Sequence, residues 1–162
     1  MHVRKATAED AQAMARVLAE VAQEGLIATE PPVDVDARAQ RMRETIEGEG
    51  PGALFVLEDD GRVVGNAGVH QTVAAGVLSL GMAILPEARG RGGGRALLEA
   101  VVDHARSCGA HKVELEVWPD NARAISVYGA AGFEVEGLRR DHYRRRDGRL
   151  RSAVLMARLL RP

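Results

Sequence analysis

The chain has 162 residues, of which 46% are hydrophobic, so we expect a single domain spanning residues 1–162 with a substantial core. The formal net charge of −1 gives no reason to expect non-specific binding to nucleic acid. Charge is uneven, since residues 1–60 carry 6 basic and 13 acidic side chains and the remainder carries 16 and 10. The single cysteine, Cys108, excludes an internal disulfide, and the five histidines show no metal-ligand spacing, so no metal is expected.

No signal peptide and no apolar run of about 18 residues is visible, so the protein is expected to be soluble and cytoplasmic, without a membrane partner. Cys108 falls in the last turn of an apolar helical segment, which predicts a buried, inert thiol. No histidine pattern places a base beside it, so covalent catalysis through Cys108 is not expected.

Hydrophobic periodicity and turn signals divide the chain into strands and helices. A capping box from Thr7 to Asp10 begins the first helix, and Asp60-Gly61 is a favoured hairpin turn. The predicted elements are strand 3–6, helix 7–23, helix 35–47, strands 53–58, 62–73 and 77–85, helix 96–109, strand 112–118, helix 121–131, and strands 133–145 and 150–159. This order predicts an α+β fold with one mixed sheet of about seven strands, covered by helices on both faces.

A glycine-rich segment connects a predicted strand to a predicted helix. It consists of Arg89, Gly90, Arg91, Gly92, Gly93, Gly94 and Arg95. The glycines let successive backbone N–H groups turn toward one anion at the helix start, and the arginines add positive charge. A P-loop is excluded because its G-x-x-x-x-G-K-[ST] spacing is absent, and Arg95 replaces the third glycine of the dinucleotide fingerprint. The segment therefore predicts a phosphate-binding loop, with an ordinary glycine-rich connection as the alternative.

Two motifs resemble those of the GNAT superfamily of N-acetyltransferases. Arg89, Gly92 and Gly94 match its R-x-x-G-x-G loop for the coenzyme A pyrophosphate, and the segment from Asn121 to Phe133 is similar to its N-x-x-A-x-x-x-Y-x-x-x-G-F pattern. The two patterns stand in the right order, and the predicted elements follow the order of the same superfamily. The resemblance implies a GNAT fold and an N-acyltransferase that uses acetyl-CoA as cosubstrate.

The resemblance also implies where acetyl-CoA binds. Main-chain groups of Met82, Ala83 and Ile84 would hold the pantetheine arm like an added strand. The segment 90–95 would receive the pyrophosphate, and Asn121 would lie beside the arm. From the residues alone, Asn121 is equally a plain helix cap.

Glu116 and Tyr128 are the predicted catalytic residues. Attack on a thioester requires a neutral amine, and Glu116 matches a catalytic glutamate in the related N-terminal alanine acetyltransferases of ribosomal proteins. Its alternatives are positioning a water, or facing solvent on an alternating strand as expected for Glu114. Tyr128 follows Asn121 by two helical turns and would contact acetyl-CoA by protonating or hydrogen-bonding the leaving thiolate; its alternative is a core tyrosine. A backbone N–H of strand 82–84 would meet the developing oxyanion.

The acceptor side of such a fold is usually formed by the loop 24–36 and the hairpin 139–151. The expected acceptor is a primary amine of a small molecule or amino acid; the alternatives are protein N-terminal or lysine acetylation and a noncatalytic acyl-CoA sensor. Glu24, Glu30 and Asp34 could hold a second amine or are ordinary surface carboxylates. The arginine-rich hairpin is expected to project from the sheet, and three roles are open for it: clamping a substrate carboxylate, contacting a homodimer partner, or binding an acidic polymer.

Overall fold

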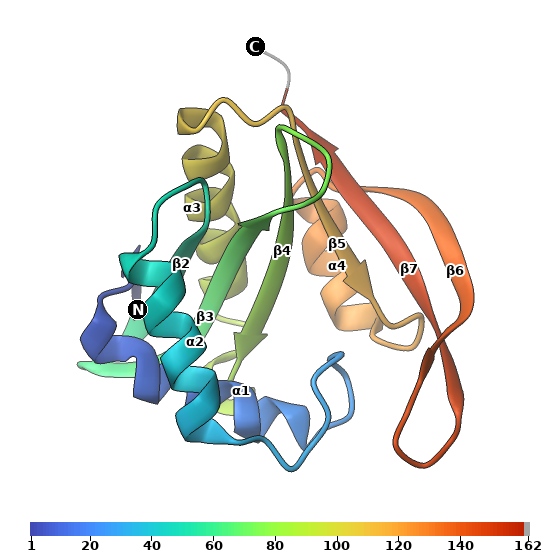
Figure 1. The fold of residues 1–162 in the computed structure, drawn as a ribbon, viewed down its shortest axis with the longest axis horizontal. Helices are drawn as coiled ribbons and strands as arrows, with labels where there is room; N and C mark the ends of the chain where they lie inside the picture. Colours follow the sequence, from blue (N-terminus) through green and yellow to red (C-terminus); the bar gives the residue numbers. More distant parts are fainter. Residues whose placement is uncertain (161–162) are drawn as a thin grey trace.

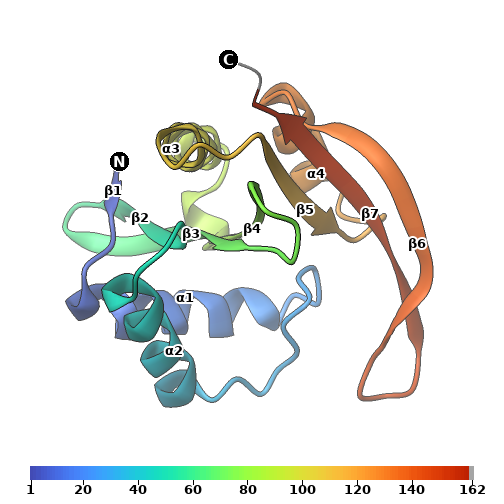
Figure 2. The same ribbon diagram turned by 45° about the horizontal axis from the view of Figure 1, so that its top comes forward.

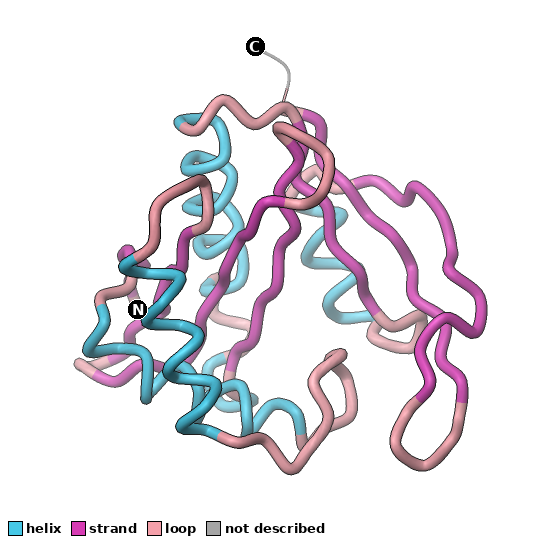
Figure 3. Tube along the Cα trace, in the orientation of Figure 1, coloured by secondary structure: helices cyan, strands magenta, loops and turns pink. Residues whose placement is uncertain are grey.

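The computed structural model describes residues 1–160, which form a seven-stranded mixed sheet with helices on both faces (Figure 1). The elements are β1 (His2–Lys5), η1 (Ala8–Asp10), α1 (Ala11–Ala22), α2 (Val35–Glu47), β2 (Ala53–Asp59), β3 (Arg62–Gln71), β4 (Val77–Ile84), η2 (Pro86–Ala88), α3 (Gly93–Ser107), β5 (Lys112–Val117), α4 (Ala122–Ala130), β6 (Glu134–Arg144) and β7 (Leu150–Leu159). The predicted order of elements and the α+β class are confirmed. Figure 3 shows the long connection between α1 and α2 as an extended loop. None of the helices in the described part of the chain is long and apolar enough to span a membrane.

The central feature of the sheet is its one parallel pair. Strand order is β1-β2-β3-β4-β5-β7-β6, and every neighbouring pair is antiparallel except β4 with β5. These two strands pair only over residues 77–79 and 112–114, although β4 continues to Ile84 and β5 to Val117. Their far ends therefore separate, and the edges that face each other have no strand partner there.

Two helices cover each face of the sheet. The first pair, α1 and α2, lies on one face, and α3 with α4 lies on the other (Figure 2). The side chains of Leu97, Leu98, Val101 and Val102 on α3 are at most 1% exposed, because the apolar stripe of this helix packs on the sheet. A second, smaller cluster joins α1, α2 and β2 around Met14. Apolar side chains thus hold both helix layers on the sheet. The separated ends of β4 and β5 are not covered by these layers.

The β6–β7 hairpin extends away from the helices, as expected (Figure 1). Nearly every residue of β6 is exposed, and its pairing with β7 is interrupted by two register shifts, between residues 135 and 137 and between 139 and 143. Such irregularities bend and twist a strand. Strand β6 therefore presents its side chains to its surroundings, whereas Ala153, Met156 and Ala157 of β7 are buried.

The prediction for Cys108 is wrong. Helix α3 ends at Ser107, and the chain reverses at Gly109 with a φ of +72°, so that Ala110 is buried and Cys108 is exposed. A histidine also lies beside it, with Nε2 of His104 3.4 Å from the sulfur. That nitrogen donates to the carbonyl of Pro51 at 3.0 Å, since a carbonyl can only accept. Nε2 therefore already has a partner other than the thiol.

A charged cluster fastens the start of the chain. Arg4 donates two hydrogen bonds to the carboxylate of Asp10, at 2.7 and 2.9 Å, and a third to Glu58 at 2.8 Å. Asp10 also accepts from the backbone N–H of Thr7 at 2.8 Å, so the predicted capping box is present. Asp10 is 8% exposed, and the cluster joins β1, the start of α1 and β2.

We expect this cluster to make unfolding depend on pH. Hydrogen bonds, first of all from Arg4, lower the pKa of Asp10 to about 2, against about 3.9 in an unfolded chain. Because the folded pKa is the lower one, the stabilisation is present above pH 4 and is lost as pH falls from about 4 to 2. Asp10→Asn should lower the free energy of unfolding at pH 7 by about 2 kcal/mol and flatten this pH dependence, as measured by urea unfolding.

The matched control is Glu9→Gln, which alters an exposed carboxylate in the same turn. Equal urea midpoints for Asp10→Asn and wild type at pH 7 would contradict the expected role of the cluster.

Candidate active site

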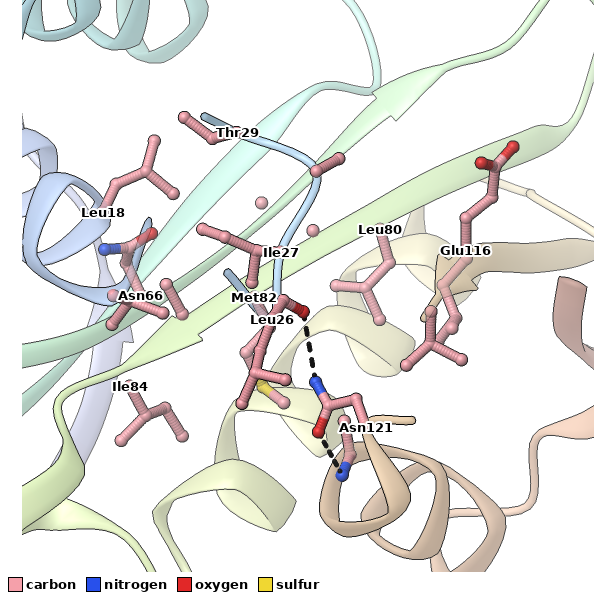
Figure 4. A pocket seen from close by; sticks show the side chains of 18 of the residues that line it. Leu18, Leu26, Ile27, Thr29, Asn66, Leu80, Met82, Ile84, Glu116 and Asn121 are labelled. Atoms are coloured by element: carbon pink, nitrogen blue, oxygen red, sulfur yellow. Dashed lines mark hydrogen bonds between the residues drawn. The ribbon is translucent and has the colours of Figure 1, made fainter. Parts of the chain in front are cut away.

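A cavity of about 1230 Å³ opens where β4 and β5 separate. Its walls come from these two strands, the loop after α1, the α2 helix and the start of α4. The sequence-predicted site residues that line it are Met82, Ala83, Ile84, Arg89, Gly90, Gly94, Glu116, Asn121 and Tyr128. Residues far apart in the sequence are thus brought together around one opening (Figure 4).

Four predicted residues of the glycine-rich segment lie outside the cavity lining. Arg91 pairs with Asp59 at 2.7 Å, and Arg95 pairs with Glu99 at 2.9 Å on the surface of α3. Gly92 has a φ of +85° at the start of α3, and a Cβ on Gly93 would lie 2.4 Å from the side chain of Leu57. These glycines therefore serve the turn and the close packing of α3 against the sheet.

The backbone of the segment nevertheless offers a set of free donors. Within residues 1–160, the N–H groups of 90–95 make no hydrogen bond to the protein, and the first helical bond of α3 runs from Ala96 to the carbonyl of Gly92 at 3.1 Å. Gly90 and Gly92 both have positive φ, which lets successive N–H groups converge. Such a concave run at the start of a helix suits an anion.

The guanidinium of Arg89 is fully engaged by other parts of the protein. Its guanidinium donates to both carboxylate oxygens of Glu24, at 2.5 and 2.8 Å, and to the carbonyl of Ile84 at 2.9 Å. The pair lowers the pKa of Glu24 and fastens the loop after α1 to the end of β4. Both oxygens of the Glu24 carboxylate therefore already have a partner in Arg89.

Asn121 connects α4 with the same loop. Its Oδ1 accepts from the N–H of Ala124 at 3.2 Å, so it is the N-cap of α4. Its Nδ2 donates to the carbonyl of Leu26 at 3.3 Å, and Figure 4 shows both bonds. The helix-cap interpretation is therefore confirmed, and the same side chain lies in the cavity wall.

Glu116 is held by two donors from the β6–β7 hairpin. Arg139 donates to Oε1 at 2.5 Å, and the hydroxyl of Tyr143 donates to Oε2. Burial, followed by the bond to Glu116, raises the pKa of Tyr143, so its hydroxyl keeps the donated proton. Glu114 lies on the same face of β5 and also lines the cavity, which differs from the solvent-facing position expected for it.

Tyr128 lies deep in the cavity wall. It is 7% exposed, and its ring packs 6.0 Å from that of Phe133. Burial raises the pKa of Tyr128 to about 12. The residue lines the cavity, and no hydrogen bond within residues 1–160 involves its hydroxyl. A protonated, unengaged hydroxyl is therefore available to a ligand.

Trp118 and its arginines were missed by sequence reasoning. The indole is 3% exposed, with the guanidinium groups of Arg145 and Arg151 at 5.2 and 4.6 Å from its ring and Tyr143 edge-on at 5.3 Å. A single tryptophan and an arginine-rich hairpin in one chain are a signal for such stacking. The signal becomes readable only when the fold shows that the two lie side by side.

The hairpin arginines bind the loop that follows α1. We call Arg145, Arg146 and Arg151 the arginine clasp. Arg145 donates to the carbonyl of Ala28 at 2.8 Å, Arg146 to that of Pro31 at 2.7 Å, and Arg151 to that of Gly25 at 2.9 Å. Glu30 accepts from the backbone N–H of Arg146 at 3.1 Å. The carboxylate of Glu30 is therefore engaged, and the loop and hairpin are joined across one side of the cavity.

Known proteins resemble this chain over most of its length. Residues 13–133 match the sequence model of the acetyltransferase (GNAT) family. The [ribosomal protein bS18]-alanine N-acetyltransferase of Escherichia coli K12 is 35% identical over 103 residues, which cover 64% of this chain and 68% of that protein.

Solved structures agree with the sequence comparison. The ribosomal-protein-alanine N-acetyltransferase of Brucella melitensis has a TM-score of 0.87 and 25% identity, covering 99% of this chain and 100% of that one. A phosphinothricin acetyltransferase of Sinorhizobium meliloti, solved in complex with AcCoA, has a TM-score of 0.85 and 27% identity, covering 98% and 87%. The expected GNAT fold is confirmed, and the chain belongs to the GNAT acetyltransferase family as an acetyl-CoA-dependent N-acetyltransferase.

Proposed function

We propose that this enzyme transfers the acetyl group of acetyl-CoA to the primary amine of a small, amino-acid-like molecule by direct attack. The observation that carries the proposal is the arginine clasp, which joins the loop 25–31 to the β6–β7 hairpin. A polypeptide entering between loop and hairpin would have to break these hydrogen bonds. A small molecule needs only the space inside the cavity.

The residues around the separated strands fit the donor. Main-chain groups of Met82, Ala83 and Ile84 would hold the pantetheine arm, and the free N–H groups of residues 90–95 would hold the pyrophosphate. Arg91 and Arg95 would add positive charge there by leaving Asp59 and Glu99. A Cβ on Gly94 would lie 3.5 Å from Ile84 and Val127, so any larger side chain there would fill the gap between β4 and α4. Bound acetyl-CoA supplies the acetyl thioester.

Two side chains are assigned to proton movement. Glu116, held in place by Arg139 and Tyr143, takes a proton from the attacking amine, directly or through a water. Tyr128 donates a hydrogen bond to the leaving sulfur, which its high pKa permits at every physiological pH. A backbone N–H of residues 82–84 meets the oxyanion. Asn121 keeps the loop and α4 together beside the pantetheine arm.

Protein N-terminal acetylation is the second candidate. It is favoured by the relatives named as ribosomal-protein alanine N-acetyltransferases, one of which is 35% identical. A noncatalytic acyl-CoA sensor is the candidate of another class. A cytoplasmic location, a homodimer and the assignment of residues 1–162 to one domain stay predictions.

The deciding experiment is an acceptor screen that detects released coenzyme A thiol. Free amino acids and small amines are compared with peptides that begin with alanine or contain lysine, and acetyl-CoA binding is measured by calorimetry on the same protein. Turnover of free amines supports the proposal. Turnover of peptides alone overturns it in favour of protein acetylation, and binding without turnover of any acceptor overturns it in favour of the sensor.

Tyr128→Phe should lower kcat about 100-fold, because the hydrogen bond to the leaving sulfur is lost in the transition state. The Tm should stay unchanged, since the hydroxyl has no protein partner to lose. The affinity for acetyl-CoA should change little, because this hydrogen bond becomes strong only when charge develops on the sulfur in the transition state. With a pKa of about 12, Tyr128 should cause no inflection in the wild-type kcat between pH 7 and 10. Wild-type kcat in the variant, with a good acceptor, would rule out its assigned role.

Glu116→Gln should lower kcat/KM for the acceptor by about 100-fold, because the proton acceptor is removed while the shape is kept. The deficit should shrink as the pH rises from 7 to 9, since more of the acceptor amine is then neutral without help. Glu134→Gln, an exposed carboxylate on β6, serves as the control. A deficit that does not change with pH would argue for a positioning role of Glu116.

A further inference from the structure

Two arginines on α2 face the cavity without a carboxylate partner. Arg38 and Arg41 both line it, and neither forms a salt bridge within the described part of the chain. Arg38 makes one long hydrogen bond, from Nη2 to the hydroxyl of Thr29 at 3.4 Å. Its Nε is buried and has no hydrogen-bond partner among residues 1–160. The α2 wall of the cavity is therefore positively charged and incompletely hydrogen-bonded.

A bound anion would relieve two unfavourable features of this wall. Burial lowers the pKa of Arg38, and the neighbouring charge of Arg41 lowers it further, so the two guanidinium groups repel each other. A buried donor without a partner costs about 1–3 kcal/mol. Charged donors in a partly buried wall are usually found where a carboxylate or phosphate binds, because the planar guanidinium matches its paired oxygens.

Carboxylates line the β5 side of the cavity, where Arg139 is bonded to one of them, Glu116. Glu114 and Glu116 lie on one face of β5 and line the same cavity. Between the two walls, Gly68 of β3 pairs with Gly81 of β4, and both line the cavity. A Cβ on Gly81 would have no heavy atom within 4 Å, so the floor there is open. The acceptor side thus has a basic wall, an acidic wall and an uncovered floor.

We propose that the acceptor is a free amino acid whose carboxylate binds Arg38 and Arg41 while its amine lies toward Glu116. This inference rests on the proposed function and names its substrate class. The amine and the carboxylate of such a molecule match the two walls in sign, and the reacting amine is placed beside the assigned proton acceptor. Amines without an anionic group leave the α2 wall unsatisfied.

The test compares free L-amino acids with their C-terminal amides, which keep the amine and remove the negative charge. Wild-type kcat/KM should be at least 10-fold higher for the acid, the size expected for one charge-assisted hydrogen bond. Arg38→Gln and Arg41→Gln should each remove most of this preference by raising KM for the acid, and should leave the amide unchanged. Arg43→Gln is the matched control, since Arg43 lies on the same helix outside the cavity lining.

The outcomes separate this inference from the function on which it rests. An equal loss for acid and amide in Arg38→Gln and Arg41→Gln, or a wild-type preference for the amide, overturns the anion-binding role while free amines remain acceptors. Use of peptides alone overturns the proposed function and this inference together. Calorimetry with acetyl-CoA on each variant tests whether the donor site is intact. If Arg38→Gln does not fold, Arg41→Gln still tests the inference, because Arg41 is exposed and its replacement should not disturb the fold.

Discussion

The separation of β4 from β5 after three paired residues is the constraint on which the rest of the site depends. Each strand keeps its other neighbour, β3 or β7, so only the two facing edges lose their partners. Backbone groups on such edges need water or a ligand. The segment 89–95 follows β4 and Asn121 follows β5, so α3 and α4 both begin near the open ends of the gap. Their N-terminal partial positive charges add to an environment suited to an anion.

Long-range contacts involve a part of the uneven charge along the chain. Acidic residues of the first sixty pair with arginines of the second half, as in Glu24 with Arg89 and Glu30 with Arg145. These pairs fasten the loop after α1 to the sheet and to the hairpin. These charges therefore serve the assembly of the cavity wall. Arg38 and Arg41 differ because they lie within the acidic half and remain unpaired in the described structure.

Local pattern predicted most of the fold. Helix 35–47 and strand 150–159 agree with the structure at both ends, and the other elements differ by a few residues at their boundaries. Helical and strand periods, glycine turns and a capping box are signals that a few neighbouring residues determine. The exposure of Cys108 was not predicted, because it depends on the chain reversal at Gly109. Hydrophobic periodicity does not indicate at which residue a helix ends.

The candidate site was predicted less completely than the fold, for a physical reason. Alternation places Glu114 and Glu116 on one face of a strand, but only the separation of β4 and β5 makes that face a cavity wall. Likewise, the pairing of Arg89 with Glu24 joins residues 65 positions apart, which no local pattern contains. The two family motifs predict a donor side because each motif is a contiguous segment of the chain. The proposed acceptor side draws on side chains of α2 and β5 and on the backbone of β3 and β4, which are separate in the sequence.

The stacking of Trp118 has a practical consequence. It is the only tryptophan of the chain, and its buried indole lies between two guanidinium groups that also bind the loop after α1. Movement of that loop away from the hairpin would change the charges beside the ring and admit water to it. With excitation that avoids the two tyrosines, the intrinsic fluorescence of the unlabelled enzyme arises from this one group beside the loop and the hairpin, and its emission wavelength provides an optical signal of whether the two are joined.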